Sequence, residues 1–161
     1  IVMIILLSGM AGLVGCVPAT VKPPVADAVA SKWQYPITKI NNAVPKGKLE
    51  PLHNTSVMLD IIQTDGMRLL VEKGTRLAGT RVGIHVHEYG GHTCVLSGTI
   101  TDFVEGKPNG VYPAGTCYYM PPNTPMSAAN LGKQDAVLID TFILPPGVPP
   151  ITIMEPGYNL E

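Results

Sequence analysis

Apolar and polar residues alternate with a period of two through the middle of the chain, a pattern that predicts β-strands. Residues 56–63 place three apolar residues on one face, Val57, Leu59 and Ile61, and Met58, Asp60 and Ile62 on the other. Asp65 and Gly66 form a typical two-residue hairpin turn, and residues 67–72 return as a second strand. Turn-forming residues then recur roughly every 8 to 12 residues, as small barrels require. The pattern predicts an all-β protein with little helix.

The last third of the chain continues this pattern. Residues 136–143 are apolar on both faces, which is typical of a barrel-wall strand covered by other segments. Residues 144–161 contain five prolines and one short apolar segment, so we expect this tail to pack over the barrel or against a neighbour. A length of 161 residues favours one domain, which we place at 33–161 with its barrel at about 55–143.

Composition supports the β assignment and narrows the range of partners. The chain has 17 glycines and 16 prolines, and the apolar segments between them are short and rich in Val, Ile, Thr and Tyr. Its net charge is -1 and only 14% of its residues are charged. Nucleic acid is therefore not an expected partner, because no basic field is available to hold it.

The first sixteen residues are apolar and too short to cross a bilayer as a stable helix. They resemble the hydrophobic part of a secretory signal, and residues 13–16 resemble the bacterial lipobox, whose cysteine, here Cys16, is acylated. The resemblance implies a lipoprotein signal at 1–16, a flexible tether at 17–32 and an anchor in the bacterial cell envelope. Val17, where aspartate would favour the inner membrane, points to the periplasmic face of the outer membrane. The alternative is a buried N-terminal strand or helix.

Two histidines, His85 and His87, are spaced so that they share one face of a strand. Two imidazoles on one face can bind a single metal ion. The alternative is a polar pair that faces solvent, and the surrounding residues decide between the two.

The segment around the histidines resembles the first motif of the cupin family, G-x5-H-x-H-x3,4-E-x6-G. A later segment resembles the second cupin motif, G-x5-P-x-G-x2-H-x3-N. The positions that match are Gly79, His85, His87 and Gly98 in the first motif, and Gly115, Pro121 and Asn130 in the second. The resemblance implies an all-β fold, a single cupin-type double-stranded β-helix (jelly-roll) barrel.

Two of the family's four conserved ligand positions are occupied differently here. The glutamate falls on Gly91 with the shorter motif spacing and on His92 with the longer one, and the second-motif histidine falls on Met126. With the longer spacing, His92 would join His85 and His87 as a third ligand for a divalent transition metal (Fe, Mn, Ni, Cu or Zn). A thioether at Met126 suits copper best. A protein without metal is the other outcome left open.

Further residues are candidates for the cavity wall. Arg81 has the same parity as the histidines, so it either orients an acidic ligand or lies solvated at the rim. Tyr118 and Tyr119 face opposite sides, so at most one reaches the cavity, and Tyr119 is our candidate beside Met126.

Two cysteines lie on the two motif strands, which are neighbours in cupin sheets. The family resemblance and the export signal together imply a disulfide between Cys94 and Cys117. Two separate buried thiols are the alternative.

Three functions agree with these features. The first is a metal-dependent enzyme, dioxygenase-like or isomerase-like, acting on a small organic molecule, as the cupin resemblance implies. The second is a metal-free module that binds a small molecule. The third is a structural part of an envelope assembly, in which the chain associates with itself, for example as a homodimer.

Overall fold

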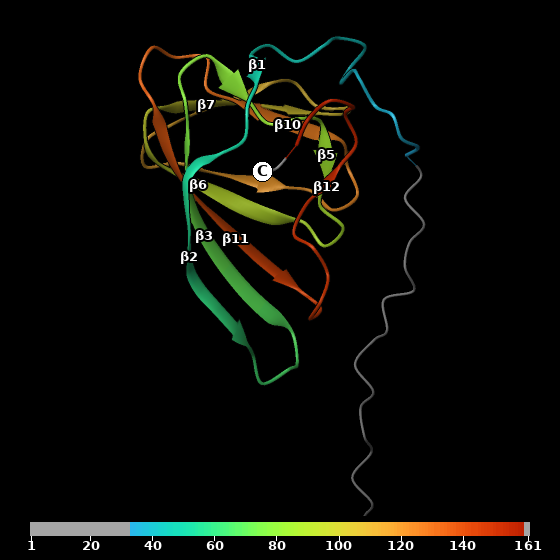
Figure 1. The fold of residues 1–161 in the computed structure, drawn as a ribbon, viewed down its shortest axis with the longest axis vertical. Coiled ribbons are helices and arrows are strands. Elements are labelled where there is room, and N and C mark those ends of the chain that lie inside the picture. Colours follow the sequence, from blue (N-terminus) through green and yellow to red (C-terminus); the bar gives the residue numbers. More distant parts are fainter. Residues whose placement is uncertain (1–32, 160–161) are drawn as a thin grey trace, which may run out of the picture.

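Residues 33–159 are described by a computed structural model, in which two β-sheets pack face to face (Figure 1). None of these residues is helical, and the same span offers no helix long and apolar enough to cross a membrane. The seven-stranded sheet contains β1 (Lys48–Leu49), β4 (Thr80–Arg81), β5 (His85–Val86), β7 (Thr99–Val104), β8 (Gly110–Pro113), β10 (Met126–Ala129) and β12 (Thr152–Ile153). The five-stranded sheet contains β2 (His53–Ile62), β3 (Arg68–Arg76), β6 (Gly91–Ser97), β9 (Cys117–Met120) and β11 (Ala136–Leu144).

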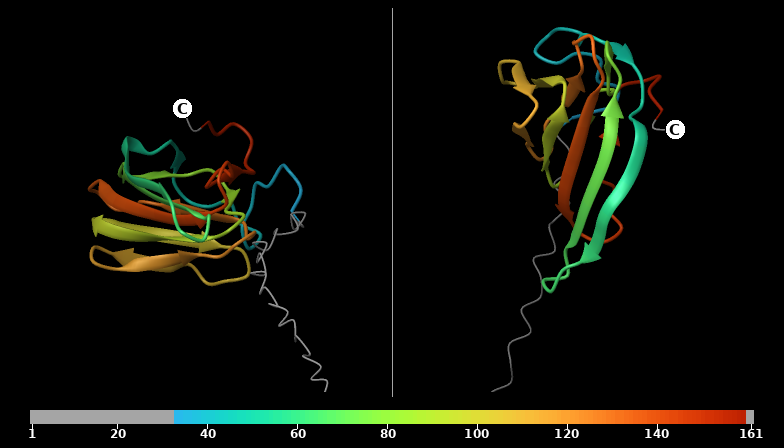
Figure 2. Two further views of the ribbon diagram at one scale, coloured as in Figure 1. Left: turned by 90° about the horizontal axis from the view of Figure 1, so that it is seen from below. Right: turned by 90° about the vertical axis from the view of Figure 1, so that its left-hand side faces the viewer.

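From β3 onward the chain passes back and forth between the two sheets. Strands β3, β6, β9 and β11 lie in the five-stranded sheet, and the strands between them in sequence lie in the other. The five-stranded sheet has the order β2-β3-β11-β6-β9, with every neighbouring pair antiparallel (Figure 2). This winding is that of a double-stranded β-helix, and it confirms the predicted all-β jelly-roll barrel. Strands β1 and β12 extend the seven-stranded sheet beyond the span of 55–143.

The predicted hairpin is confirmed as β2 and β3. Gly66 has a φ of 83°, and the carboxylate of Asp65 accepts a hydrogen bond from the Met67 amide at 2.9 Å, which stabilises the turn. Strand β2 forms one edge of its sheet, and β3 is its only partner among the strands of the described residues. Its apolar residues remain accessible on both faces, with Val57 58% and Ile62 58% exposed.

Strand β11 lies at the centre of the five-stranded sheet, between β3 and β6. Its inward residues, among them Leu138 and Phe142, are buried as expected. The outer face is only partly covered, because no layer from residues 33–159 packs on it, and Ile143 is 51% exposed. The prediction that other segments cover both faces of 136–143 is therefore wrong for the outer face.

Two motif residues are explained by the turns in which they lie. Gly98 has a φ of 75° and joins β6 to β7, a backbone conformation that favours glycine. The side-chain amide of Asn130 donates to the backbone carbonyls of Arg76 at 3.0 Å and Gln134 at 2.8 Å. Asn130 therefore organises the turn from β10 into β11 and has no role in the cavity.

Candidate metal and ligand site

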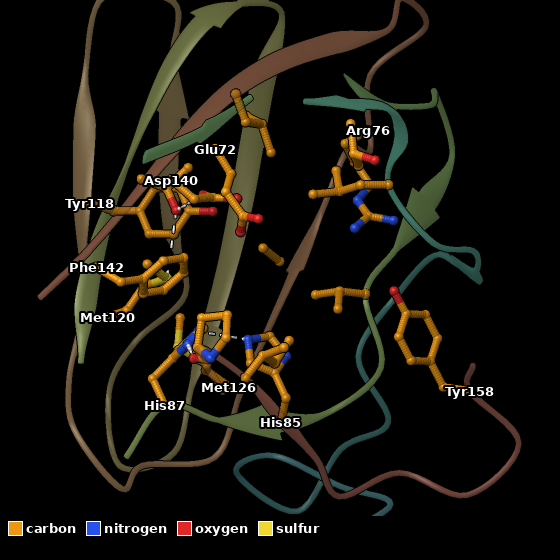
Figure 3. Close-up of a pocket in the computed structure, with 18 residues that line it drawn as sticks. Glu72, Arg76, His85, His87, Tyr118, Met120, Met126, Asp140, Phe142 and Tyr158 are labelled. Atoms are coloured by element: carbon orange, nitrogen blue, oxygen red, sulfur yellow. Dashed lines mark hydrogen bonds between the residues drawn. The ribbon is translucent and has the colours of Figure 1, made fainter. Parts of the chain in front are cut away.

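A cavity of about 290 Å³ lies between the two sheets. The seven-stranded sheet contributes His85, and His87 follows directly after β5, while the five-stranded sheet forms the opposite wall (Figure 3). The C-terminal tail closes one side, since Pro150, Ile151 and Tyr158 also line the cavity. The prediction that the tail packs over the barrel is thus confirmed, and the tail helps to form the site.

The two histidines are buried side by side, with only 4% of His85 and 3% of His87 exposed. Their rings are nearly perpendicular, with centroids 4.7 Å apart. Strand β5 is held between β10 and β12, where His85 pairs with Met126 and with Ile153. Both histidines therefore face the cavity, as their spacing predicted, and the solvent-facing alternative is excluded.

Two backbone carbonyls determine where the ring protons lie. Nδ1 of His85 is 2.7 Å from the oxygen of Gly83, and Nδ1 of His87 is 2.6 Å from the oxygen of Pro150. A carbonyl oxygen only accepts hydrogen bonds, so each Nδ1 must carry a hydrogen. In two neutral rings, both Nε2 atoms are then unprotonated, and these two atoms lie 3.0 Å apart.

A proton between the two Nε2 atoms would form a hydrogen bond there, but it would give the histidine pair a positive charge. Burial, together with the proximity of His87, lowers the pKa of His85 to about 3. Burial also lowers the pKa of His87 to about 4. At neutral pH both rings are therefore uncharged, and two lone pairs face one another without a hydrogen between them.

The geometry of this pair fits a metal ion better than it fits two free rings. Two metal–nitrogen bonds of about 2.0–2.1 Å that meet at roughly a right angle span a distance close to the observed 3.0 Å. However, no group of three or more His, Cys, Asp or Glu side chains within residues 33–159 is arranged to hold a metal ion. For a metal ion, the described residues would supply two nitrogen ligands, His85 and His87.

The expectation that His92 joins the two histidines is wrong. His92 is exposed on the outer face of β6, directly opposite Tyr119 of β9. Thr93 of the same strand is buried and lines the cavity, and Gly91 shares its parity, so the shorter motif spacing applies. A Cβ atom on Gly91 would lie 2.8 Å from the Phe142 ring, so a side chain there would need its neighbours to move.

The expectation that Tyr119 reaches the cavity is also wrong, because its side chain lies on the outer face of β9. Tyr119 is 61% exposed on the outer face, whereas Tyr118 is buried and lines the cavity. Met126 lines the cavity as expected and is 1% exposed.

Arg81 is buried, yet it contacts a carboxylate of the chain in place of a ligand. Its guanidinium donates to both carboxylate oxygens of Glu155, at 2.6 and 2.8 Å. Glu155 also accepts a hydrogen bond from the Ile84 amide at 2.8 Å. Arg81 does not line the cavity, so both sequence-based alternatives for it are wrong, and the residue fastens the tail to the barrel.

The register of the five-stranded sheet creates a polar row that the sequence reasoning missed. Asp140 pairs with Glu72 on one side and with Thr93 on the other, and Thr93 pairs with Tyr118. All four side chains line the cavity, and we call them the polar row. Each lies at an inward position of a mostly apolar strand, which is the signal that would have found them.

The polar row contains two carboxyl groups in an apolar setting. The Thr93 hydroxyl donates to Asp140 at 2.5 Å. Burial raises the pKa of Asp140 to about 6, with a further contribution from Glu72, and burial also raises the pKa of Glu72. The neighbouring inward row is apolar where it contains Leu70, Phe142 and Met120.

Cys94 and Cys117 form a disulfide that links β6 to β9, with their Cα atoms 4.0 Å apart. Cys94 alternates with the inward Thr93, so the bond lies on the outer face of the sheet, away from the cavity. Cys16 and the segments 1–16 and 17–32 lie outside the described residues.

No protein-family model and no curated protein matches this chain. Similar solved structures include a double-stranded β-helix protein from Klebsiella pneumoniae, 20% identical over 68% of this chain and 86% of that chain, with a TM-score of 0.51. They also include the DMSP lyase DddQ from Ruegeria pomeroyi, 14% identical over 67% of this chain and about half (54%) of that chain, with a TM-score of 0.53. An RmlC-like cupin from Methanocaldococcus jannaschii is 14% identical over 64% of this chain and 92% of that chain, with a TM-score of 0.47. At these identities the likeness concerns the fold. Two face-to-face sheets with a cavity between them, together with the neighbours from Klebsiella pneumoniae and Ruegeria pomeroyi, identify the fold of the chain as a cupin-type double-stranded β-helix.

Proposed function

We propose that His85 and His87 hold a divalent transition metal ion, beside which the cavity binds a small organic molecule, and that the protein is a metal-dependent enzyme. The observation that carries this proposal is the 3.0 Å separation of the two Nε2 atoms. The contacts of both Nδ1 atoms with carbonyl oxygens assign the ring hydrogens to Nδ1. Without a cation between the two Nε2 atoms, their contact is repulsive. A bound metal ion would act as a Lewis acid on an oxygen atom of the substrate.

The chain itself prepares the cavity for this task. The carbonyls of Gly83 and Pro150 orient the two rings, as outer hydrogen bonds do in metal sites. Met126, Met120 and Phe142 form an apolar wall that keeps water from the ligand. The inward position at Gly91 is too crowded for a third ligating side chain, so a bound metal would be open to a substrate oxygen or to water.

The test is elemental analysis of the 161-residue chain, purified without chelator or affinity tag and then incubated in turn with Fe, Mn, Ni, Cu and Zn. We expect close to one ion per chain with the preferred metal, and loss of the ion in His85→Gln and in His87→Gln. His92→Gln is the matched control, because this histidine lies on the outer face, and it should keep the ion.

A parent protein that binds none of the five metals would overturn the proposal. The metal-free binding module would then be the better assignment. Retention of the ion in both cavity variants would also overturn it, because the ion would lie elsewhere.

For localisation, we propose that the protein works in the bacterial envelope, anchored by acylated Cys16. The disulfide supports this location, because such bonds persist in oxidising compartments. Cys16→Ser should release the chain from the membrane fraction or leave it unprocessed. Unchanged fractionation would count against the anchor.

For assembly, we propose a homodimer in which β2 pairs antiparallel with β2 of a second copy. The strand is ten residues long, lies at a sheet edge and exposes apolar side chains on both faces. An edge of this kind is a template for strand pairing. With Leu59 on the two-fold axis, Val57 of one copy would lie opposite Ile61 of the other.

A further inference from the structure

The polar row has more hydrogen-bond acceptors than donors. Thr93 uses its hydroxyl hydrogen for one oxygen of Asp140. Glu72 has no hydrogen bond and no ion pair among residues 33–159, and the second oxygen of Asp140 likewise has no donor there. Three carboxylate oxygens therefore remain for a ligand.

The two arginines nearest to Glu72 in the sequence form their hydrogen bonds with other groups. Arg68 and Arg76 lie on β3, four residues to either side of Glu72. Arg68 pairs with Asp60 at 2.8 Å, and the Arg76 guanidinium donates to the carbonyl of Glu50. Neither arginine forms an ion pair with the two carboxylates of the row. Arg76 also lines the cavity and acts on Asp140 at longer range, so its single charge compensates at most one of the two carboxylates.

The cavity carries a second and independent sign of a ligand. His85 and His87 are more than nine-tenths buried, and their Nε2 lone pairs face the same cavity without a donor. In Figure 3 the histidines lie on one side of the cavity, and Glu72, Asp140 and Tyr118 lie on another. The cavity thus has two polar regions separated by apolar side chains. One is the polar row, and the other, which we call the histidine pole, consists of His85 and His87.

We propose that the polar row binds the protonated amine of a small ligand, whose oxygen-bearing end reaches the histidine pole. A primary ammonium group supplies three N–H donors and one positive charge, which matches the three acceptor oxygens and the excess negative charge of the row. A neutral hydroxyl compound would donate hydrogen bonds and leave that charge uncompensated.

The setting of the row favours a cation for two further reasons. The side chains of Tyr118 and Phe142 line the same cavity, and aromatic rings attract cations. A cavity of about 290 Å³ limits the ligand to a small molecule, of the size of an amino acid or a short amine. The part of the inference that concerns the far end of the ligand rests on the metal site proposed above. The amine site does not.

The experiment uses three probes of nearly equal size: n-butylammonium, n-butanol and butyrate. Each is titrated into the 161-residue chain at pH 7.5 in amine-free buffer, and binding is followed by amide chemical shifts. We expect butylammonium to bind at least about tenfold more tightly than butanol, because charge-assisted hydrogen bonds are the stronger kind.

Two conservative variants localise the effect. Glu72→Gln and Asp140→Asn keep the shape of the row and remove one charge each, and each should bring the affinity for butylammonium close to that for butanol. Glu88→Gln is the matched control, because Glu88 does not line the cavity, and it should bind butylammonium as the parent does.

Equal affinity of the parent for butylammonium and butanol would overturn the inference, and this comparison needs no variant to fold. Unchanged affinity in both row variants would overturn it as well. Tightest binding of butyrate would mean that the cavity selects anions.

Metal content measured in the same samples separates this inference from the proposed function. Full metal with no preference for the amine removes the inference alone. A preference for the amine in protein that binds no metal removes the metal proposal alone.

Discussion

Asp140 shows how a buried carboxyl group of the cavity changes the stability of the fold. Burial raises its pKa to about 6, above the ordinary value of 3.8, so the folded state holds the proton more tightly than the unfolded chain. This contribution to stability is fully present below about pH 4 and is lost as the pH rises through 6. A carboxylate in this place costs stability at neutral pH, as functional groups often do.

We therefore expect Asp140→Asn to be more stable than the parent at pH 7.5, by roughly 1–3 kcal/mol at about 1.4 kcal/mol per pKa unit. At pH 4 the difference should shrink towards zero, because the parent is then protonated too. Urea unfolding at both pH values measures this. Glu88→Gln serves as the control, and an Asp140→Asn protein that is no more stable at pH 7.5 would contradict the expectation.

The histidine pair has the opposite pH dependence. Burial lowers both pKa values, to about 3 and about 4, below the ordinary 6.5. Between these pH values the two histidines bind protons in the unfolded chain but not in the folded protein. The free energy of unfolding therefore falls as the pH drops from about 6.5 towards 4. In His85→Gln this loss should be smaller than in the parent, as thermal unfolding of metal-free samples between pH 7 and pH 4.5 would show. A parallel decline in parent and variant would argue against the buried, neutral state of His85.

The buried ion pair between Arg81 and Glu155 also affects the stability of the fold. Both residues are buried, and removing one partner leaves the other charge without compensation, at a typical cost of about 3–5 kcal/mol. Glu155→Ala should lose about this much stability in urea and should loosen the tail that lines the cavity. Glu105→Ala, a change at a carboxylate outside the cavity, should cost far less. Similar losses in the two variants would mean that the buried pair is not decisive.

At the scale of elements, β2 and the hairpin it forms project from the barrel with accessible apolar residues on both faces (Figure 1). A lysine in the middle of such a strand discourages edge pairing. Leu59→Lys should therefore convert a dimer into a monomer in analytical ultracentrifugation. Ile143→Lys, a change on the exposed face of the central β11, should leave the dimer intact. A parent that stays monomeric at high concentration would rule out the proposed dimer.

For the whole molecule, the disulfide between β6 and β9 closes a loop with a sequence separation of 23 residues. Loops of this length are associated with a stabilisation of about 3 kcal/mol. Cys94→Ser together with Cys117→Ser should lower the free energy of unfolding by about this amount. Metal content should be unchanged, because the bond lies on the outer face of the sheet. Loss of both stability and metal would instead tie the disulfide to the cavity.

Local patterns were sufficient for the strands and for the fold class. The hairpin around Gly66, the turn at Gly98 and the inward pair His85 and His87 all depend on neighbours in sequence and on the period of two. The match to the cupin motifs correctly predicted the barrel, because those motifs consist mainly of turn residues and inward positions.

The expectations for His92 and Tyr119 were wrong because the alternation of side chains along one strand cannot be extrapolated across a turn to the next strand. Four residues separate His87 from His92, and the chain turns at Gly90 with a φ of 72°, so alternation along one strand does not continue into the next. Only the pairing of β6 with β9 and β11 shows that Thr93 and Tyr118 point inward, and His92 and Tyr119 outward.

By itself, the sequence determined the β-strands, the turns and the shared face of the two histidines, because each depends on residues a few positions apart. The tertiary structure alone decided the partner of Arg81, which is Glu155 in the tail, and the assembly of the polar row. Glu72 and Asp140 are 68 positions apart in the chain, and they meet because the register of β3 and β11 places them opposite each other. Long-range register of this kind is set by the packing of whole sheets, which no local pattern encodes.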